Sequence, residues 1–195
     1  ALEGAMVSWA ELDGEGYSLA DEVRALVHRE PEAREPILEA ALALLSRREP
    51  RNAQRAVLHV LKGLDLSTAD LSTRVPLVIT LLPAVHGMVT AALLPMVLGA
   101  ELEPDDLREI GTTILVRKEK AQKTVLLKHL ASLEDPGSRE VVVELLTTAS
   151  ASEDSSFAAK ARETLEKLGE AAPELAPVSL IVEWRSADDV TPRVP

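Results

Sequence analysis

The residues best suited to binding chemistry lie in one short basic stretch of the sequence. Arg117, Lys120 and Lys123 lie within it, with Lys118 and Lys128 close by. On a helix, positions 120 and 123 share one side, where lysine ammonium groups can contact phosphates. We therefore expect Arg117, Lys120 and Lys123 to belong to an interaction surface.

The four histidines are the next candidates, and they offer little metal chemistry. They are His28, His59, His86 and His129. No two have the HxxxH spacing of a helical metal site, and no acidic residue completes a known zinc pattern. We interpret them as partly exposed structural residues. Because His59 and His129 fall in two segments of related sequence, we add both to the expected interaction surface.

Carboxylates are dense in two places, but their pattern does not indicate catalysis. They are Asp13, Glu15, Asp21 and Glu22, and then Glu101, Glu103, Asp105 and Asp106. The D-x-D-x-D-G calcium pattern is missing, and acids in a first helical turn complement the helix dipole. GxSxG, GxxxxGK[ST] and GxGxxG are also missing. We therefore expect no enzyme activity, no catalytic residues, no metal site and no cofactor.

Composition limits the class of protein further. The formal net charge of −11 disfavours a nucleic-acid partner, which needs a basic face. The absence of cysteine excludes disulfides and thiolate metal sites, and we expect a cytoplasmic location. Aromatic residues make up only 2%, so leucine, valine, alanine and isoleucine must build the core, which favours helices. The bias toward alanine, arginine, leucine, valine and glutamate indicates a bacterial protein.

Helix-start signals recur along most of the chain. Glu-Pro occurs at 30–31, 35–36, 49–50 and 103–104, and proline is well tolerated in a first helical turn. Asp135-Pro136 and Asp154 open two later segments, and Gly169 is a candidate C-terminal cap. These signals predict about nine helices of about 10 to 16 residues, joined by short connections.

Two phrases of the sequence are nearly the same. AQRAVL occupies residues 53–58 and AQKTVL occupies 121–126, and 121 − 53 = 68. Glu35-Pro36 and Glu103-Pro104 have the same separation, since 103 − 35 = 68. This interval divides into two units of about 34 residues, the size of a helical hairpin in repeat proteins.

In its paired helices, its Leu/Val/Ala cores and its prolines near helix starts, the chain resembles HEAT-type repeats over roughly residues 18–168. The resemblance implies an all-α fold: a right-handed α-solenoid of about four stacked antiparallel helical hairpins, with an irregular C-terminal tail. We divide the chain into a cap segment at 1–17, a HEAT-like repeat domain at 18–169 and a proline-rich tail at 170–195. The apolar stretch 178–184 either packs back on the hairpins or begins a following domain.

Residues 75–100 contain no Asp, Glu, Lys or Arg, and the stretch is long enough to cross a bilayer. Pro83, His86 and Gly87 divide it into two halves that are each too short to span. We therefore expect two buried helices in the middle of the fold. An exposed apolar groove for a partner is a second interpretation, and a membrane span is a third.

The expected function is that of a non-catalytic protein–protein interaction or scaffold module, as part of a larger bacterial protein. The partner is an unidentified protein, and the sequence leaves the oligomeric state open. One alternative is a nucleic-acid-binding or nucleic-acid-processing domain, because HEAT-like DNA glycosylases bind DNA on a concave basic surface. The other is membrane association through residues 75–100.

Overall fold

The computed structural model describes residues 18–170, and every regular element in that range is a helix. The predicted cap segment 1–17, the tail from 171 onward and its apolar stretch 178–184 lie outside the described residues. The described residues form ten α-helices and two short 3-10 turns. They are α2 (Leu19–Arg29), η1 (Pro31–Ala33), α3 (Arg34–Ser46), α4 (Arg51–Gly63), α5 (Thr68–Ser72), α6 (Val75–Leu81), α7 (Gly87–Leu98), α8 (Pro104–Val116), α9 (Lys120–Ser132), η2 (Pro136–Ser138), α10 (Arg139–Ser150) and α11 (Ser155–Lys167).

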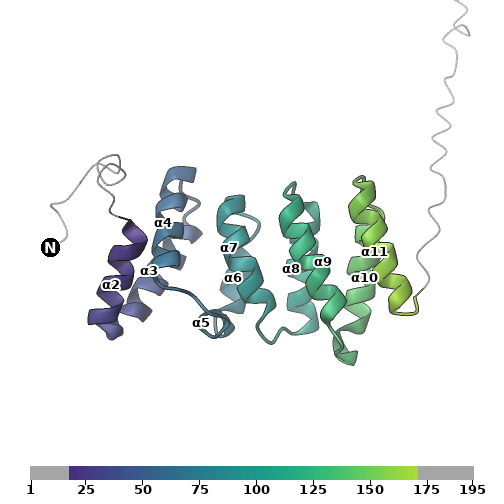
Figure 1. The fold of residues 1–195 in the computed structure, drawn as a ribbon, viewed down its shortest axis with the longest axis horizontal. Coiled ribbons are helices and arrows are strands. Elements are labelled where there is room, and N and C mark those ends of the chain that lie inside the picture. The colour runs from purple at the N-terminus through teal and green to yellow at the C-terminus, as the bar shows by residue number, and fades with distance from the viewer. Residues whose placement is uncertain (1–17, 171–195) are drawn as a thin grey trace, which may run out of the picture.

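Helices that follow each other along the chain pack in pairs, as predicted. The pairs are α3 with α4, α6 with α7, α8 with α9, and α10 with α11. They stand side by side along the long axis of the molecule (Figure 1). The first helices of neighbouring pairs contact each other, α6 with α8 and α8 with α10. The second helices do the same, in the order α4, α7, α9 and α11, with α2 packed against α4.

The core runs continuously through these pairs and is built from aliphatic side chains. One apolar cluster of buried residues extends from Val23 in α2 to Leu165 in α11. Phe157 is the only aromatic side chain among residues 18–170. The prediction of a helical core built from leucine, valine, alanine and isoleucine is therefore confirmed.

The local signals for helix ends were also correct in several places. Pro104 is the first residue of α8, and Asp154 is the N-cap of α11. Gly169 follows α11 with a positive φ of 76°, where the main-chain N–H of Glu170 donates to the carbonyl of Leu165. This is the hydrogen bond of a Schellman motif, and glycine adopts its left-handed conformation without steric cost.

The uncharged stretch 75–100 forms two short helices, α6 and α7, joined by a turn. The prediction of a buried helical pair is confirmed, since seven of these side chains are almost completely inaccessible to solvent: Val78, Leu82, Val89, Thr90, Leu93, Leu94 and Val97. Among residues 18–170, no helix is both long enough and apolar enough to cross a bilayer.

The repeated Ala-Gln phrase lies in the first turns of α4 and α9, on either side of α7. Gln54 and Gln122 are both buried, although glutamine is usually exposed. The Gln54 side-chain oxygen accepts a hydrogen bond from the main-chain N–H of His86 at 2.7 Å. The Gln122 side-chain amide donates to the carbonyl of Gly87 at 2.8 Å. The two glutamines thus hold the start of α7 from both neighbouring pairs.

A second recurring phrase, which we did not predict, is Pro-x-x-Arg-Glu at residues 31–35 and 136–140. In both places the proline opens a 3-10 turn and the arginine is the first residue of the next helix. Arg34 donates to a main-chain carbonyl just after α4, and Arg139 donates to the carbonyl of Leu168, just after α11, at 2.7 Å. Each arginine therefore satisfies an orphan carbonyl at the end of its own pair.

Candidate functional site

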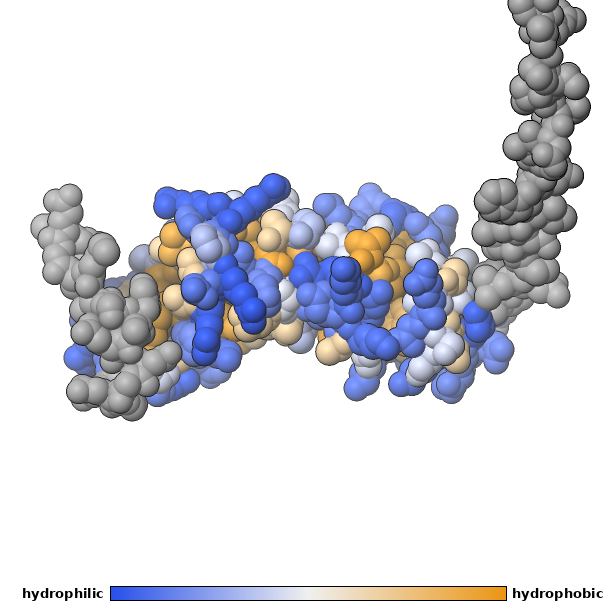
Figure 2. Space-filling view, turned by 90° about the horizontal axis from the view of Figure 1, so that it is seen from above, coloured by the Kyte–Doolittle hydropathy of each residue, from blue (hydrophilic) through white to orange (hydrophobic). Residues whose placement is uncertain are grey.

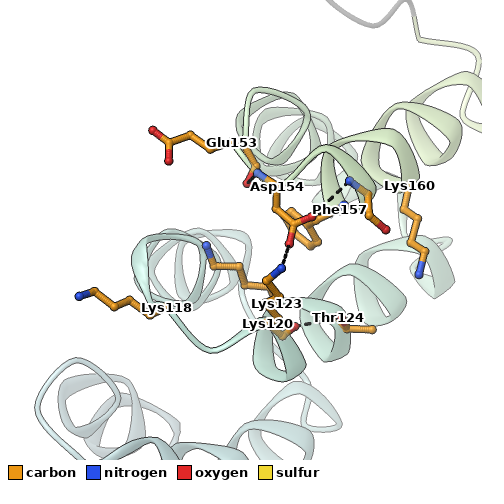
Figure 3. A pocket seen from close by; sticks show the side chains of 10 residues that line it. Lys118, Lys120, Lys123, Thr124, Glu153, Asp154, Phe157 and Lys160 are labelled. Carbon is orange, nitrogen blue, oxygen red and sulfur yellow. Dashed lines mark hydrogen bonds and ion pairs between the residues drawn. The ribbon is translucent and has the colours of Figure 1, made fainter.

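A cavity of about 500 Å³ opens between the first turns of α9 and α11. The two helices begin 35 residues apart, since 155 − 120 = 35, and both are second helices of their pairs. Their N-terminal ends therefore lie at the same side of the molecule, where both contribute to the cavity wall (Figure 3). The lining includes Lys118, Lys120, Lys123, Asp154, Phe157 and Lys160.

Lysine side chains are concentrated at this cavity. The whole chain has seven lysines, at positions 62, 118, 120, 123, 128, 160 and 167, and four of them line it. Among residues 18–170, Lys118, Lys123 and Lys160 form no ion pair with a carboxylate. Figure 3 shows them distributed around the pair of Lys120 and Asp154 rather than at one point. The cavity is therefore basic on a chain whose net charge is −11.

A carboxylate of the chain itself already lies among these lysines. Asp154 accepts hydrogen bonds from the main-chain N–H groups of Ser156 and Phe157 at 3.2 and 3.3 Å. Its second oxygen lies 2.7 Å from the Lys120 ammonium group (Figure 3). The hydrogen bond with Lys120, followed by the one from Phe157, holds the pKa of Asp154 below its ordinary value. This position thus stabilises a negative charge.

Phe157 gives the cavity an apolar wall beside its charges. Its side chain is only 9% exposed and joins the continuous core, while its remaining surface faces the cavity. The site thus combines lysine ammonium groups with one aromatic surface, which suits a ligand that is anionic and partly apolar.

Two of the five residues expected at an interaction surface meet at this cavity, Lys120 and Lys123. Arg117 instead donates to the main-chain carbonyls of Leu82 and Val85, at 2.7 and 3.2 Å, in the turn between α6 and α7. Its guanidinium group therefore joins neighbouring pairs.

The two histidines of the expected surface do not line the cavity. His59 is half-buried in α4, and His129 is half-buried in the last turn of α9. Burial lowers the pKa of His129. Neither histidine joins a metal site: among residues 18–170, no three His, Asp or Glu side chains are grouped so that they could hold a metal ion.

Sequence reasoning missed the residues that α11 contributes to the cavity, Phe157 and Lys160. The available signal was the interval of 35 residues between two helix starts, since second helices of adjacent pairs begin at the same level. For a basic residue in the first turns of α9, this interval predicts that residues about 35 positions further along the chain lie beside it in space.

The described residues form an all-α fold of ten helices, eight of which pack as four consecutive pairs. Comparison of the chain with models of known families, with curated proteins and with solved structures gave no match. The function must therefore be inferred from the residues and their geometry.

Proposed function

We propose that this chain is a right-handed, HEAT-like α-solenoid that serves as a non-catalytic protein-interaction or scaffold module. The packing of neighbouring pairs supports it, and so do the recurring phrases. The Ala-Gln phrases are 68 residues apart and the Pro-x-x-Arg-Glu phrases are 105 apart, since 136 − 31 = 105. These intervals are close to two and three times the same unit of about 35 residues, which is typical of helical repeats.

The observation that carries the proposal is the cavity between adjacent second helices. Stacked pairs present the outer sides of α4, α7, α9 and α11 as one extended face. On the side seen in Figure 2, hydrophilic side chains separate the apolar areas. A partner on such a face would gain most of its binding energy from a few anchor points, and we propose the lysine-lined cavity as one of them.

Nucleic-acid binding is the second candidate, because the lysines at the cavity would also attract phosphates. The remaining lysines disfavour it: Lys62 lies on α4, and Lys128 and Lys167 lie nearer the C-terminal ends of α9 and α11. These three lysines do not extend the cavity into a basic stripe that could follow a nucleic-acid backbone, and the net charge of −11 also disfavours such a partner.

The proposal is tested by photo-crosslinking. A photoreactive amino acid replaces Ser156, which is exposed at the cavity, and in a control variant it replaces Thr112, which is exposed on α8. We expect irradiation in an extract of the source cells to link a reproducible protein to position 156 and not to position 112. Crosslinks to nucleic acid alone, or equal protein labelling at both positions, would contradict the proposal.

A further inference from the structure

We propose that the cavity between α9 and α11 binds a short acidic segment of a protein partner, with at least one apolar side chain beside its carboxylates. The inference rests on the proposed protein-binding function and adds the chemistry of the partner. The carboxylates would pair with Lys118, Lys123 and Lys160, and the apolar side chain would contact Phe157.

The charge balance of the cavity supports an anionic ligand. Four lysines line it, against Glu153 and Asp154, so the lining residues carry 4 − 2 = +2. The chain as a whole carries −11. The charge of the cavity is thus opposite in sign to that of the chain as a whole, which favours an acidic segment at this place. Such a local reversal of potential selects the place of binding more than it raises affinity.

The pair of Asp154 and Lys120 shows how a carboxylate is held here. Asp154 accepts hydrogen bonds from two main-chain N–H groups and forms an ion pair with one ammonium group, so its negative charge is already paired within the chain. Lys118, Lys123 and Lys160 lack such a match among the described residues. Lysines are compact charges on flexible stems, and they can meet carboxylates that arrive at different angles.

The size and composition of the cavity favour a peptide segment over a nucleic acid. A volume of about 500 Å³ is in the usual range for a site that holds a small group or a few side chains. Single-stranded nucleic acids bind to exposed aromatic side chains on which successive bases stack. Phe157 is the only aromatic side chain in the described part of the chain, so successive bases would find no series of aromatic side chains on which to stack.

The test measures the fluorescence anisotropy of a labelled short peptide of alternating glutamate and leucine, titrated with the full chain at low salt. A peptide with glutamine in place of glutamate and a single-stranded oligonucleotide are the comparison probes. We expect the glutamate peptide to bind more tightly than both. Tighter binding of the oligonucleotide, or equal binding of the two peptides, would overturn the inference.

Charge-reversed variants locate the site. Lys123→Glu combined with Lys160→Glu should weaken binding of the glutamate peptide by about tenfold or more, because two ammonium groups are lost and two carboxylates are gained. The matched control, Lys62→Glu combined with Lys128→Glu, changes the net charge equally and should alter binding by less than about twofold. An equal loss in both variants would show a general charge effect and overturn the assignment.

Two further measurements keep the result interpretable. Because Lys123 and Lys160 form no ion pairs among residues 18–170, the variants should unfold at the same temperature as the parent. If they do not, Lys123→Gln with Lys160→Gln replaces the charge reversal. If position 156 still crosslinks to a protein while the glutamate peptide fails to bind, only the inference falls. If position 156 also labels no protein, the proposed function falls with it.

Discussion

Thr90 in α7 is completely buried, and its hydroxyl group has no hydrogen-bond partner among the described residues. A buried polar group without a partner costs about 1 to 3 kcal/mol. Thr90→Val replaces this hydroxyl with a methyl group of similar size. We expect the free energy of unfolding to rise by about 1 kcal/mol, measured by urea denaturation.

Thr164→Val is the matched control for this substitution. The Thr164 hydroxyl donates to the carbonyl of Lys160 at 2.9 Å, so its removal should bring no such gain. A lower stability of Thr90→Val than of the parent would show that the buried hydroxyl makes a favourable interaction.

The hydrogen bonds of Gln54 and Gln122 predict which of the two residues contributes more to the free energy of unfolding. Gln54 uses both ends of its amide, because it also donates to the carbonyl of Glu49 at 2.8 Å. Gln122 uses only its amide nitrogen, and its buried side-chain oxygen has no partner among the described residues. Gln54→Leu should therefore destabilise the chain by about 1 to 3 kcal/mol, and Gln122→Leu by less. Denaturation curves that give the reverse order would show that the hydrogen bonds at both ends of the Gln54 amide do not make it the more stabilising residue.

The sequence pointed to these glutamines through a repeated phrase, but it did not predict that they are buried. Burial of a polar side chain depends on a partner in another pair, here the turn at His86 and Gly87. Lys160 was missed for the same reason, because its significance depends on a neighbour 35 or more residues away. Local patterns predict helices well and contacts between helices poorly.

Among the helices, the contact between α2 and α4 depends on the absence of a side chain. A Cβ atom at Gly63 would lie 2.4 Å from the main-chain oxygen of Ala20 and 2.7 Å from the Cβ atom of Val23. Backbone atoms cannot yield as a flexible side chain can, so α2 would have to move away from α4.

Gly63→Ala should therefore lower the free energy of unfolding by about 1 to 3 kcal/mol, although alanine is the better helix former. Thermal unfolding followed by circular dichroism measures this change. Gly87→Ala is a useful control, because the three atoms nearest to its new Cβ atom all belong to the side chain of Glu119, which can turn aside. Equal loss in both variants would contradict the close approach of α2 and α4.

Helix positions were predicted better than helix number. About nine helices were expected, and ten α-helices are present in residues 18–170. The shortest is α5, a helix of five residues whose start is fixed by Ser67 and Asp70. A segment this short has too few apolar positions to show a helical period, so the sequence indicates only where the helix begins.

At the scale of the whole molecule, several carboxylates make stability depend on pH. Burial raises the pKa of Asp70, but hydrogen bonds from Arg34 and Ser67 outweigh it and the net pKa is lowered. The Ser138 hydroxyl lowers the pKa of Asp135, and Lys120 lowers that of Asp154. A carboxylate whose pKa is lowered by folding stabilises the folded state above its ordinary pKa of 3.8, and this contribution is lost as pH falls below it.

We therefore expect a first, small fall of the unfolding temperature below about pH 6.5, because folding lowers the pKa of His129 from its ordinary value of 6.5. A larger fall should follow between about pH 4 and pH 2, where the carboxylates become protonated. Scans by circular dichroism across this range would measure it. In Asp135→Asn the side chain can still cap η2 but cannot titrate, so the decline should be shallower. An unchanged decline in that variant would show that acid acts elsewhere.

The pairing of the helices followed from periodicity and short connections, since a short loop returns the chain beside the helix it has just left. The packing of one pair against the next could not be predicted from periodicity and short connections. It depends in part on Arg117, whose guanidinium group donates to the carbonyl of Leu82 in the neighbouring pair. Arg34 and Arg139 also reach distant carbonyls, but within their own pairs. Arginines of this kind look like ordinary surface charges in a sequence.

The main contacts in the described chain join each pair only to the pairs beside it. A gene for such a chain can gain or lose a stretch that encodes one whole pair. The helices on either side of the junction can then still pack against the first and second helices of an adjacent pair. The length of the molecule is thus free to change during evolution in steps of one pair. The lysine-lined cavity would persist through such changes, provided that α9 and α11 stay adjacent.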